Sequence, residues 1–340
     1  MSSYTYKKKD VKSFIAEIYA KGLQPSQYLS INEIQKLIES IGIFKFKGYL
    51  YAFKSDFTSH NLDEVFVLYF FDKYLTQYLM DLTFGVEAKL KSSLIELCYQ
   101  KTTNPFFYLA LKHHKNPRFY INKETLKNWK NLQMVHTTST TSEVYKHYGM
   151  YYRQKYDFNS NKTRYLGQEI LIPLTNDVNY PPFHYLIESS TLGVLIYFIK
   201  SLKINNFDVL NAIASSFNIN QSAHFDSFLE RLNEIRNRAA HRERLFNRSY
   251  RSVTGFGKFN ALRSSVSNHR VIDVILFLLF SLNKLGTYPS YGDFERDIID
   301  RLFMAFQNDY EVGRDSFGLL NKLSNAEFGA IRGFILGAMK

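Results

Sequence analysis

Apolar residues along this chain recur every three or four positions, the spacing of one face of an α-helix. A capping pattern from Ser30 to Glu33 precedes the first such face, and Gly42 follows it. A second capping pattern, from Ser324 to Glu327, opens a C-terminal helix. Similar spacing predicts helices over the ranges 183–202, 207–217, 225–244, 271–285 and 294–308. The pattern therefore predicts an all-α protein.

The longest stretch with helical spacing runs from Leu62 to about Tyr99. It contains no proline and a single glycine, Gly85. A glycine in a helix interior costs about 1 kcal/mol relative to alanine. We therefore expect two consecutive long helices with a break near Gly85.

The middle of the chain, from about Asn104 to Pro182, is less regular. It contains five of the seven prolines and two polar, loop-like runs at 137–142 and 159–161. No internal repeat or flexible linker marks a boundary. We expect residues 1–340 to form a single all-α domain with an irregular excursion over about 104–182. The segment of about 183–285 that follows it contains the helix predicted over 225–244, which carries the motif described below.

The composition is that of a globular protein with an excess of positive charge. Hydrophobic residues make up 45% and charged residues 22%. The net charge of +12 favours a polyanionic partner, either nucleic acid or an anionic membrane surface. The longest apolar run, 271–282, is too short to span a bilayer, and residues 1–14 lack the apolar run of a signal peptide. We expect a cytoplasmic protein with no membrane partner.

Cysteine, histidine and carboxylate usage favours neither a metal nor another cofactor. Cys98 is the only cysteine, which excludes a disulfide framework and a thiolate zinc site. His113 and His114 have no carboxylate or cysteine nearby to complete a zinc site, so we expect both at the surface. The Asp63–Glu64 pair and the carboxylates of 297–300 are candidate nuclease ligands, but a helix start and a solvated face explain them more simply.

The range 234–241 carries the most suggestive chemistry. An arginine, Arg236, can hold a phosphate, and a histidine, His241, can transfer a proton near neutral pH. On a helix the two would lie about 140° apart, so that they flank a surface. Asn237 lies about one turn from His241. This combination suits cleavage of an RNA phosphodiester.

Further cations follow these residues. The range 236–270 contains nine Lys or Arg against a single acidic residue, Glu243. Clustered cations interleaved with aromatic rings suit a groove that follows a sugar–phosphate backbone. A solvated, arginine-rich helix end is the alternative interpretation. The candidate RNA-binding residues are Arg238, Arg242, Arg244, Arg248, Arg251 and Lys258.

The motif Arg236-Asn237-x-x-x-His241, together with the Arg-Glu-Arg-Leu-Phe-Asn-Arg that follows it, resembles a family signature. It is similar to bacterial abortive-infection proteins of the Abi-D/Abi-F type, which belong to the HEPN ribonuclease superfamily. Other blocks that resemble the family occur in order at 44–51, 71–73, 86–91 and 181–193. Lysine stands at positions 45, 73 and 91, where the family usually has arginine, so the charge is kept and the planar fork is lost.

This resemblance implies an HEPN-like helical bundle with additional N-terminal and C-terminal helices. It also implies a metal-independent endoribonuclease with Arg236 and His241 as the catalytic pair and Asn237 orienting the histidine or binding the phosphate. Attack by the RNA 2′-hydroxyl would leave 5′-hydroxyl ends. Glu87 and Lys91 are candidates for residues that contact the catalytic side chains without contacting the substrate. A core ion pair is an equally good interpretation of Glu87.

The role that the resemblance implies is an anti-phage toxin, with RNA as substrate and a structured small RNA as an antitoxin partner. The chain contains one Arg-x-x-x-x-His, whereas in-line RNA cleavage benefits from two proton-transfer groups. We therefore expect a homodimer that pairs two motifs. A non-catalytic RNA-binding protein and a DNA-directed, metal-dependent nuclease are the alternatives.

Overall fold

The computed structural model describes residues 10–105, 107–109, 113–115, 164–165, 168–169, 183–217, 219, 221–254, 270–271, 275, 294–309 and 317–339. The described residues are mostly helical, with two short two-stranded sheets, which confirms the all-α class. The chain divides into two compact units. The first unit comprises Met1–Thr83 and Glu234–Lys340, and the second comprises Phe84–Asn233. Both boundaries fall inside helices, and the single domain expected from the sequence stays a prediction.

The first unit begins with a series of short helices. These are α1 (Val11–Ala20), α2 (Ile31–Ile41), α3 (Ile43–Leu50) and the 3-10 helix η1 (Tyr51–Phe53). The predicted capping box of α2 is present: the Ser30 hydroxyl accepts from the Glu33 amide, and the Glu33 carboxylate accepts from the Ser30 amide at 2.7 Å. Gly42 ends α2 with a φ of 85°, a left-handed backbone that glycine adopts without strain, and α3 begins at the next residue.

The long helix α4 (Leu62–Tyr99) is continuous over 38 residues, so the break expected near Gly85 is wrong. Leu82 and Val86, on either side of that glycine, are both buried. Burial of apolar side chains all along α4 stabilises it by more than the roughly 1 kcal/mol that one glycine costs.

The start of α4 explains two acidic residues that the sequence offered as metal ligands. The Glu64 amide donates to the Asn61 side chain at 3.0 Å, and the Glu64 carboxylate accepts from the Asn61 amide at 2.9 Å. The buried Asp63 carboxylate accepts from the amide of Gln27 at 2.7 Å and from the Ser26 hydroxyl. Both carboxylates therefore cap or brace the helix start, which confirms the simpler interpretation.

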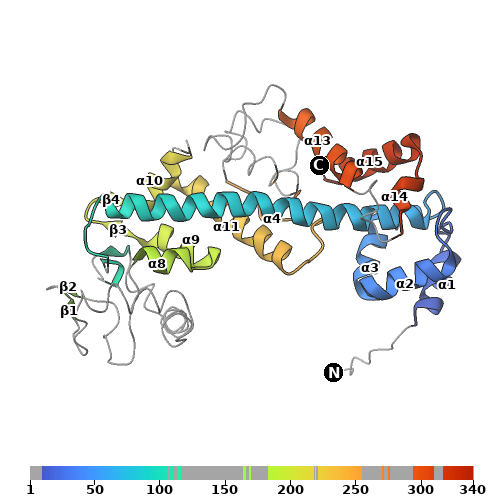
Figure 1. Cartoon of the computed structure of the whole chain (residues 1–340), viewed down its shortest axis with the longest axis horizontal. Helices are drawn as coiled ribbons and strands as arrows, with labels where there is room; N and C mark the ends of the chain where they lie inside the picture. The colour runs from blue at the N-terminus through green and yellow to red at the C-terminus, as the bar shows by residue number, and fades with distance from the viewer. Residues whose placement is uncertain are drawn as a thin grey trace. The chain divides into compact units, whose positions relative to one another are not determined.

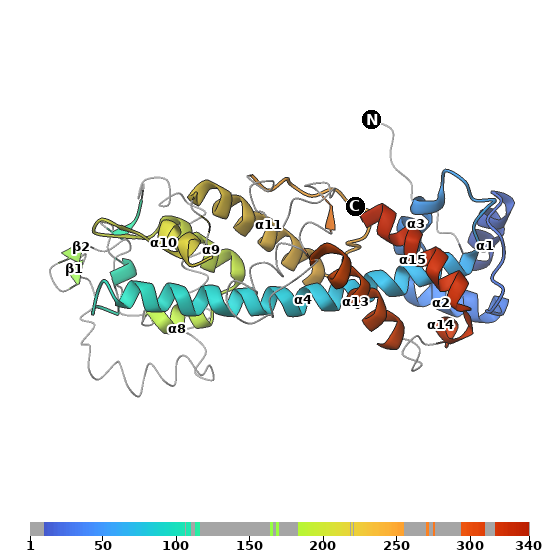
Figure 2. The ribbon, with the colours of Figure 1, turned by 90° about the horizontal axis from the view of Figure 1, so that it is seen from above.

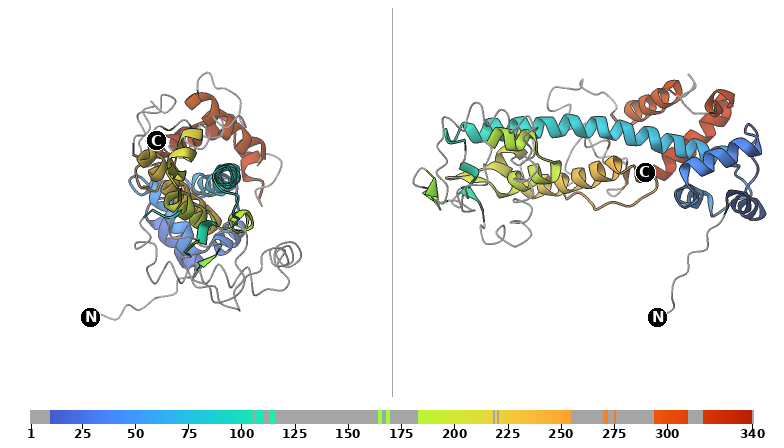
Figure 3. Two further views of the ribbon diagram at one scale, coloured as in Figure 1. Left: turned by 90° about the vertical axis from the view of Figure 1, so that its left-hand side faces the viewer. Right: turned by 60° about the horizontal axis from the view of Figure 1, so that its bottom comes forward.

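Three C-terminal helices complete the first unit: α13 (Phe294–Asp309), α14 (Leu319–Lys322) and α15 (Asn325–Met339). The ring of Phe71 on α4 stacks on Phe303 of α13, with 4.8 Å between their centroids. Phe53 and Phe334 stack at 4.7 Å, so the predicted C-terminal helix packs against η1. In Figure 1, α1–α3 lie below the first part of α4 and α13 lies above it, while the right-hand view of Figure 3 shows the C-terminal segment, in red, beside the N-terminal helices, in blue.

The predicted capping box of α15 is also present. The Glu327 carboxylate accepts from the Ser324 amide at 2.8 Å, and the Ser324 hydroxyl accepts from the Glu327 amide at 3.3 Å. Tyr28 donates to the same carboxylate at 2.8 Å. This contact joins the loop before α2 to the C-terminal helix.

The second unit consists of the last part of α4, short helices and small strand pairs. Its elements are η2 (Phe107–Leu109), β1 (Arg164–Tyr165), β2 (Gln168–Glu169), α8 (Phe183–Glu188), α9 (Leu192–Ser201), β3 (Lys203–Ile204), β4 (Phe207–Asp208), α10 (Val209–Ser216) and most of α11 (Ser222–Ala240). Figure 2 shows α8 and α9 beside this part of α4. The single helix predicted over 183–202 is divided, because Thr191 takes an extended backbone as the N-cap of α9.

His113 and His114 are both buried in the second unit, so the surface position expected for them is wrong. The Lys115 amide donates to Ser201 at 2.8 Å, and the Lys115 ammonium pairs with Asp208 at 2.7 Å. These contacts hold the histidine segment against the β3–β4 hairpin. The His114 ring lies 2.7 Å from the Tyr108 carbonyl oxygen, and burial lowers the pKa of His114 to about 4.

The predicted helix over 294–308 is confirmed by α13, whereas most of the helix predicted over 271–285 lies outside the described residues. The excursion over about 104–182 also lies mainly outside them. Among the described residues, no helix combines the length and the apolar character needed to cross a bilayer.

Candidate functional site

The predicted catalytic residues lie at the C-terminal end of α11, in the first unit. Arg236 and Asn237 occupy the last turn and a half, and His241 is the first residue beyond the helix. The Arg236 guanidinium is half-buried and donates from Nη1 to Asn237 Oδ1 at 3.3 Å. Asn237 and His241 are exposed, and the His241 amide donates to the Asn237 carbonyl oxygen at 3.0 Å. The structure therefore places all three residues at one helix end, with the side chains of Arg236 and Asn237 in contact.

The helix ends at Ala240, so its predicted continuation to about Arg244 is wrong. The amide of Arg242 donates to Ala239 at 2.9 Å, and the amide of Glu243 donates to Arg238 at 2.9 Å. These two bonds form a Schellman motif, which closes a helix and turns the chain away. Arg242 occupies the left-handed position of this motif, with a φ of 52°.

The segment after this turn is held by a buried carboxylate of α4. Asp72 is 2% exposed and accepts from the amides of Leu245 at 3.1 Å and Phe246 at 2.7 Å. The hydroxyl of Tyr49, on α3, donates to it at 2.8 Å. Burial raises the pKa of Asp72, while these three donors favour the ionised form and oppose the shift.

A second contact between α3 and this segment comes from Arg244, whose Nη1 donates to the Gly48 carbonyl oxygen. A Cβ at position 48 would lie 3.4 Å from Arg244 Nε, an ordinary van der Waals contact, so the arginine side chain lies directly over α3. Arg244 is half-buried and holds the loop in place. Its role as an RNA contact stays a prediction.

Two of the other predicted RNA-binding arginines share one carboxylate. Arg238 pairs with Glu234 at 3.0 Å and with Glu243 at 3.7 Å, and its guanidinium lies 5.4 Å from the centre of the Tyr250 ring. Arg248 also lies 3.7 Å from Glu243. Both charges are thus partly compensated within the protein.

The remaining predicted RNA-binding residues differ in their surroundings. Arg242 and Arg251 are exposed, and Lys258 lies outside the described residues. The exposed side chains of Arg242 and Arg251 are accessible to a phosphate from solution.

Glu87 and Lys91 belong to the second unit, whereas the residues from Arg236 to His241 belong to the first. Glu87 is 8% exposed and pairs with Lys91 at 3.2 Å. Lys91 also donates to the Glu188 carbonyl oxygen of α8 at 3.0 Å. The ion-pair interpretation is confirmed, and a supporting role toward the motif stays a prediction.

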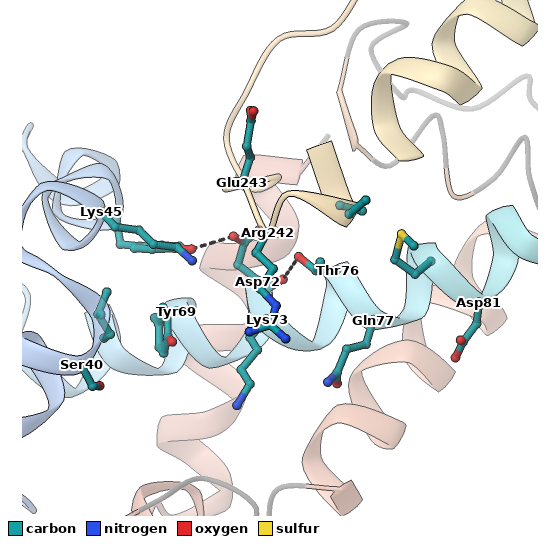
Figure 4. Close-up of a pocket in the computed structure, with 15 residues that line it drawn as sticks. Ser40, Lys45, Tyr69, Asp72, Lys73, Thr76, Gln77, Asp81, Arg242 and Glu243 are labelled. Atoms are coloured by element: carbon teal, nitrogen blue, oxygen red, sulfur yellow. Dashed lines mark hydrogen bonds between the residues drawn. The ribbon is translucent and has the colours of Figure 1, made fainter. Parts of the chain in front are cut away.

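A pocket that the sequence did not predict lies beside the turn, within the first unit. Its volume is about 660 Å³, and its lining includes Lys45 of α3, Lys73 of α4 and Arg242 (Figure 4). Ala239 and Ala240 also line it. The only hint in the sequence is that the lysines at 45 and 73 replace arginines in two blocks that resemble the abortive-infection family. Because Lys45 and Lys73 lie in different blocks of the chain, the sequence alone does not indicate that both line one cavity.

Among the described residues, no group of three or more histidine, cysteine or acidic side chains is placed to hold a metal ion. The carboxylates near the motif, Asp72 and Glu243, instead bind backbone amides or arginines of this protein.

The sequence model of the Abi-like protein family matches residues 36–247, more than half of the chain. The protein therefore belongs to this abortive-infection family. The matched range contains Gly48, Asp72 and the whole of α11, that is, the motif and the groups that hold the segment after it. No curated protein and no solved structure matches the chain.

Proposed function

We propose that this protein is an abortive-infection toxin of the Abi-D/Abi-F type, an HEPN endoribonuclease that cleaves RNA without a metal ion. The observation that carries the proposal is the arrangement of an arginine and an exposed imidazole at a helix end whose following segment is anchored by Asp72. Such anchoring fixes the position of catalytic groups before a substrate arrives, which reduces the reorganisation that the reaction requires.

In the proposed reaction, the His241 imidazole accepts the proton of an RNA 2′-hydroxyl. The 2′-oxygen then attacks the adjacent phosphorus, and the bond from phosphorus to the 5′-oxygen breaks. The departing 5′-oxygen takes up a proton, so the products are a 2′,3′-cyclic phosphate and a 5′-hydroxyl. Arg236 stabilises the charge that develops on the phosphoryl oxygens, and Asn237 orients the histidine or binds the phosphate.

The proton for the leaving oxygen requires a second donor. A homodimer that brings two copies of the α11 end together supplies a second His241, one acting as base and the other as acid. Exposure of Asn237 and His241 is compatible with such pairing. RNA is the substrate and, as a structured small RNA, also the partner that restrains the toxin in the cytoplasm. The net charge of +12 supports a polyanionic partner.

The alternative is a non-catalytic protein that binds a structured small RNA through the same basic helix end. The exposed positions of Arg242 and Arg251 favour RNA binding in either case.

The test is cleavage of total bacterial RNA by the purified protein in excess chelator. Wild type is compared with His241→Ala and with His224→Ala, which removes another histidine of α11. We expect fragments with 5′-hydroxyl ends from wild type and His224→Ala only. Equal cleavage by His241→Ala would contradict the assignment. Loss of cleavage in chelator would indicate a metal-dependent nuclease, and RNA binding without cleavage by all three proteins would favour the alternative.

A further inference from the structure

The pocket beside the α11 turn is built from four parts of the first unit. Its walls come from the end of α2, from α3, from the first part of α4 and from the turn at the end of α11. Its volume of about 660 Å³ lies within the range typical of small-ligand sites. Arg236, Asn237 and His241 do not line it, so it is separate from the motif.

Three cations line this pocket: Lys45, Lys73 and Arg242. Figure 4 shows Lys45 reaching from α3 toward Arg242, Lys73 extending from α4 away from Lys45, and Asp81 farther along α4. Within the described part of the chain, none of the three forms an ion pair or a side-chain hydrogen bond. Several cations that line one pocket without such partners favour a multiply charged anion such as a phosphate.

The backbone at Arg242 supplies a second, independent observation. A left-handed conformation costs about 1 kcal/mol or more for any residue with a Cβ, and glycine is usual at this position of a Schellman motif. This chain has an arginine there, with a φ of 52°, and its side chain lines the pocket. Strain kept at one residue is typical of positions where the side chain has a function.

The carboxylates around the pocket do not cancel these cations. Asp72 accepts hydrogen bonds from two backbone amides and the Tyr49 hydroxyl, and Glu243 lies between Arg238 and Arg248. Asp81 is exposed at the other end. A ligand with an anion at one end and hydrogen-bond donors at the other therefore fits both ends.

A nucleotide has this distribution of groups. Its phosphate is the anion, and its 2′-hydroxyl or exocyclic amine can donate to Asp81 or to the nearby Gln77. Tyr69, which is partly exposed, contributes an aromatic ring to the wall, and aromatic rings stack readily on bases.

We propose that this pocket binds one nucleotide of an RNA strand, with its phosphate on Lys45, Lys73 and Arg242. The choice of a strand rests on the proposed function: Ala239 and Ala240, which line the pocket, lie between the motif residues Asn237 and His241 in the chain. A strand that crosses this turn reaches the motif and the pocket together. The pocket then sets where along the RNA the scissile bond lies.

The test measures the affinity for a short single-stranded RNA oligonucleotide with 2′-O-methyl groups, which lacks the attacking hydroxyl and is not cleaved. The full-length variants Arg242→Gly and Lys73→Gln are compared with Lys36→Gln. Lys36 is an exposed helix lysine that does not line the pocket, so it is matched to Lys73 in charge and exposure. Arg242→Gly removes the side chain and also relieves the strained backbone, so loss of binding cannot be attributed to misfolding.

We expect both pocket variants to bind roughly fivefold to tenfold more weakly, while Lys36→Gln binds like wild type. The slope of the logarithm of affinity against the logarithm of salt concentration should become shallower by about 0.7 for each lost phosphate contact. Wild-type affinity and salt slope in both pocket variants would overturn the proposal. A second result would also overturn the proposal. If adenosine monophosphate binds wild type with micromolar affinity, and Arg242→Gly loses this binding but still binds the RNA oligonucleotide like wild type, the ligand is a free nucleotide.

The experiments can refute the pocket proposal and the ribonuclease proposal independently of each other. If the pocket variants lose affinity for the oligonucleotide but no protein cleaves ordinary RNA, the pocket stands and the ribonuclease assignment falls. If wild-type protein cleaves RNA through His241 and both pocket variants bind and cleave as wild type does, the ribonuclease assignment stands and the pocket proposal falls.

Discussion

Asp72 on α4 accepts a hydrogen bond of 2.7 Å from the amide of Phe246, a residue 174 positions later in the chain. The bond ties the segment after the motif to the longest helix. Together with the Leu245 amide and the Tyr49 hydroxyl, it makes Asp72 the group on which the position of the α11 turn depends.

Replacing this carboxylate tests that dependence. In Asp72→Asn, one side-chain oxygen becomes an amide nitrogen, which cannot accept a hydrogen bond from a donor. At least one buried donor is left without an acceptor, so we expect the free energy of unfolding to fall by roughly 2–3 kcal/mol. Urea denaturation followed by circular dichroism would measure this fall.

The matched control for Asp72→Asn is Asp81→Asn, the same change at an exposed position of α4. We expect its stability to stay within about 0.5 kcal/mol of wild type. Equal stabilities for the two variants would show that the carboxylate of Asp72 does not hold the segment.

Replacing two glycines by alanine should change the free energy of unfolding in opposite directions. Gly42 has a φ of 85°, so alanine there is strained although no atom lies within 4 Å of the added Cβ. Gly329 lies within α15, and a Cβ there also meets nothing within 4 Å. We expect Gly42→Ala to lower the free energy of unfolding by about 1 kcal/mol and Gly329→Ala to raise it by roughly 0.5–1 kcal/mol.

Thermal and urea unfolding of these two variants, measured side by side, would check the prediction. Because the two substitutions add the same methyl group in open space, the difference between them reports the backbone alone. A loss of stability in both variants would argue against a helical backbone at Gly329.

Features that depend on neighbouring residues could be predicted from the sequence, whereas features that depend on distant contacts could not. The capping boxes at Ser30 and Ser324 were predicted correctly, because each depends on residues three positions apart. The end of α11 was not, because the Schellman turn at Arg242 lacks the expected glycine. Likewise, Gly85 suggested a break in α4 that burial of its neighbours prevents.

In the candidate site, too, the features set by neighbouring residues were predictable and those set by distant contacts were not. Arg236, Asn237 and His241 are close in sequence, and the structure places them together at one helix end. The role of Asp72 and the pocket around Lys45 and Lys73 depend on contacts between helices that are far apart in the chain. Such contacts leave no periodic signal in a single sequence.

Strain at Arg242 gives a further prediction for stability. Replacing it by glycine should raise the free energy of unfolding by up to about 1 kcal/mol, since glycine adopts a φ of 52° without strain. Arg242→Ala is the control, because it removes the same charge and keeps a Cβ. We expect Arg242→Ala to match wild type in urea denaturation; an equal gain in both variants would attribute the effect to charge and not to the backbone.

Stability below neutral pH should depend on His114 in the second unit. Burial lowers its pKa in the folded protein to about 4, from the ordinary histidine value of 6.5 in the unfolded chain. Between these two pH values the unfolded chain binds a proton at this histidine and the folded protein does not. The free energy of unfolding therefore falls as the pH falls from about 6.5 to about 4, by an amount on the order of 3 kcal/mol, and this contribution is fully present above pH 6.5.

Urea denaturation of wild type, His114→Gln and His224→Gln at several pH values across this window would measure the effect. The glutamine amide nitrogen takes the place of the histidine Nε2 that contacts the Tyr108 carbonyl oxygen but does not titrate, so His114→Gln should lose most of the pH dependence. His224→Gln, the same substitution elsewhere in the same unit, should keep it. A pH dependence as steep in His114→Gln as in wild type would show that another group takes up the proton on unfolding.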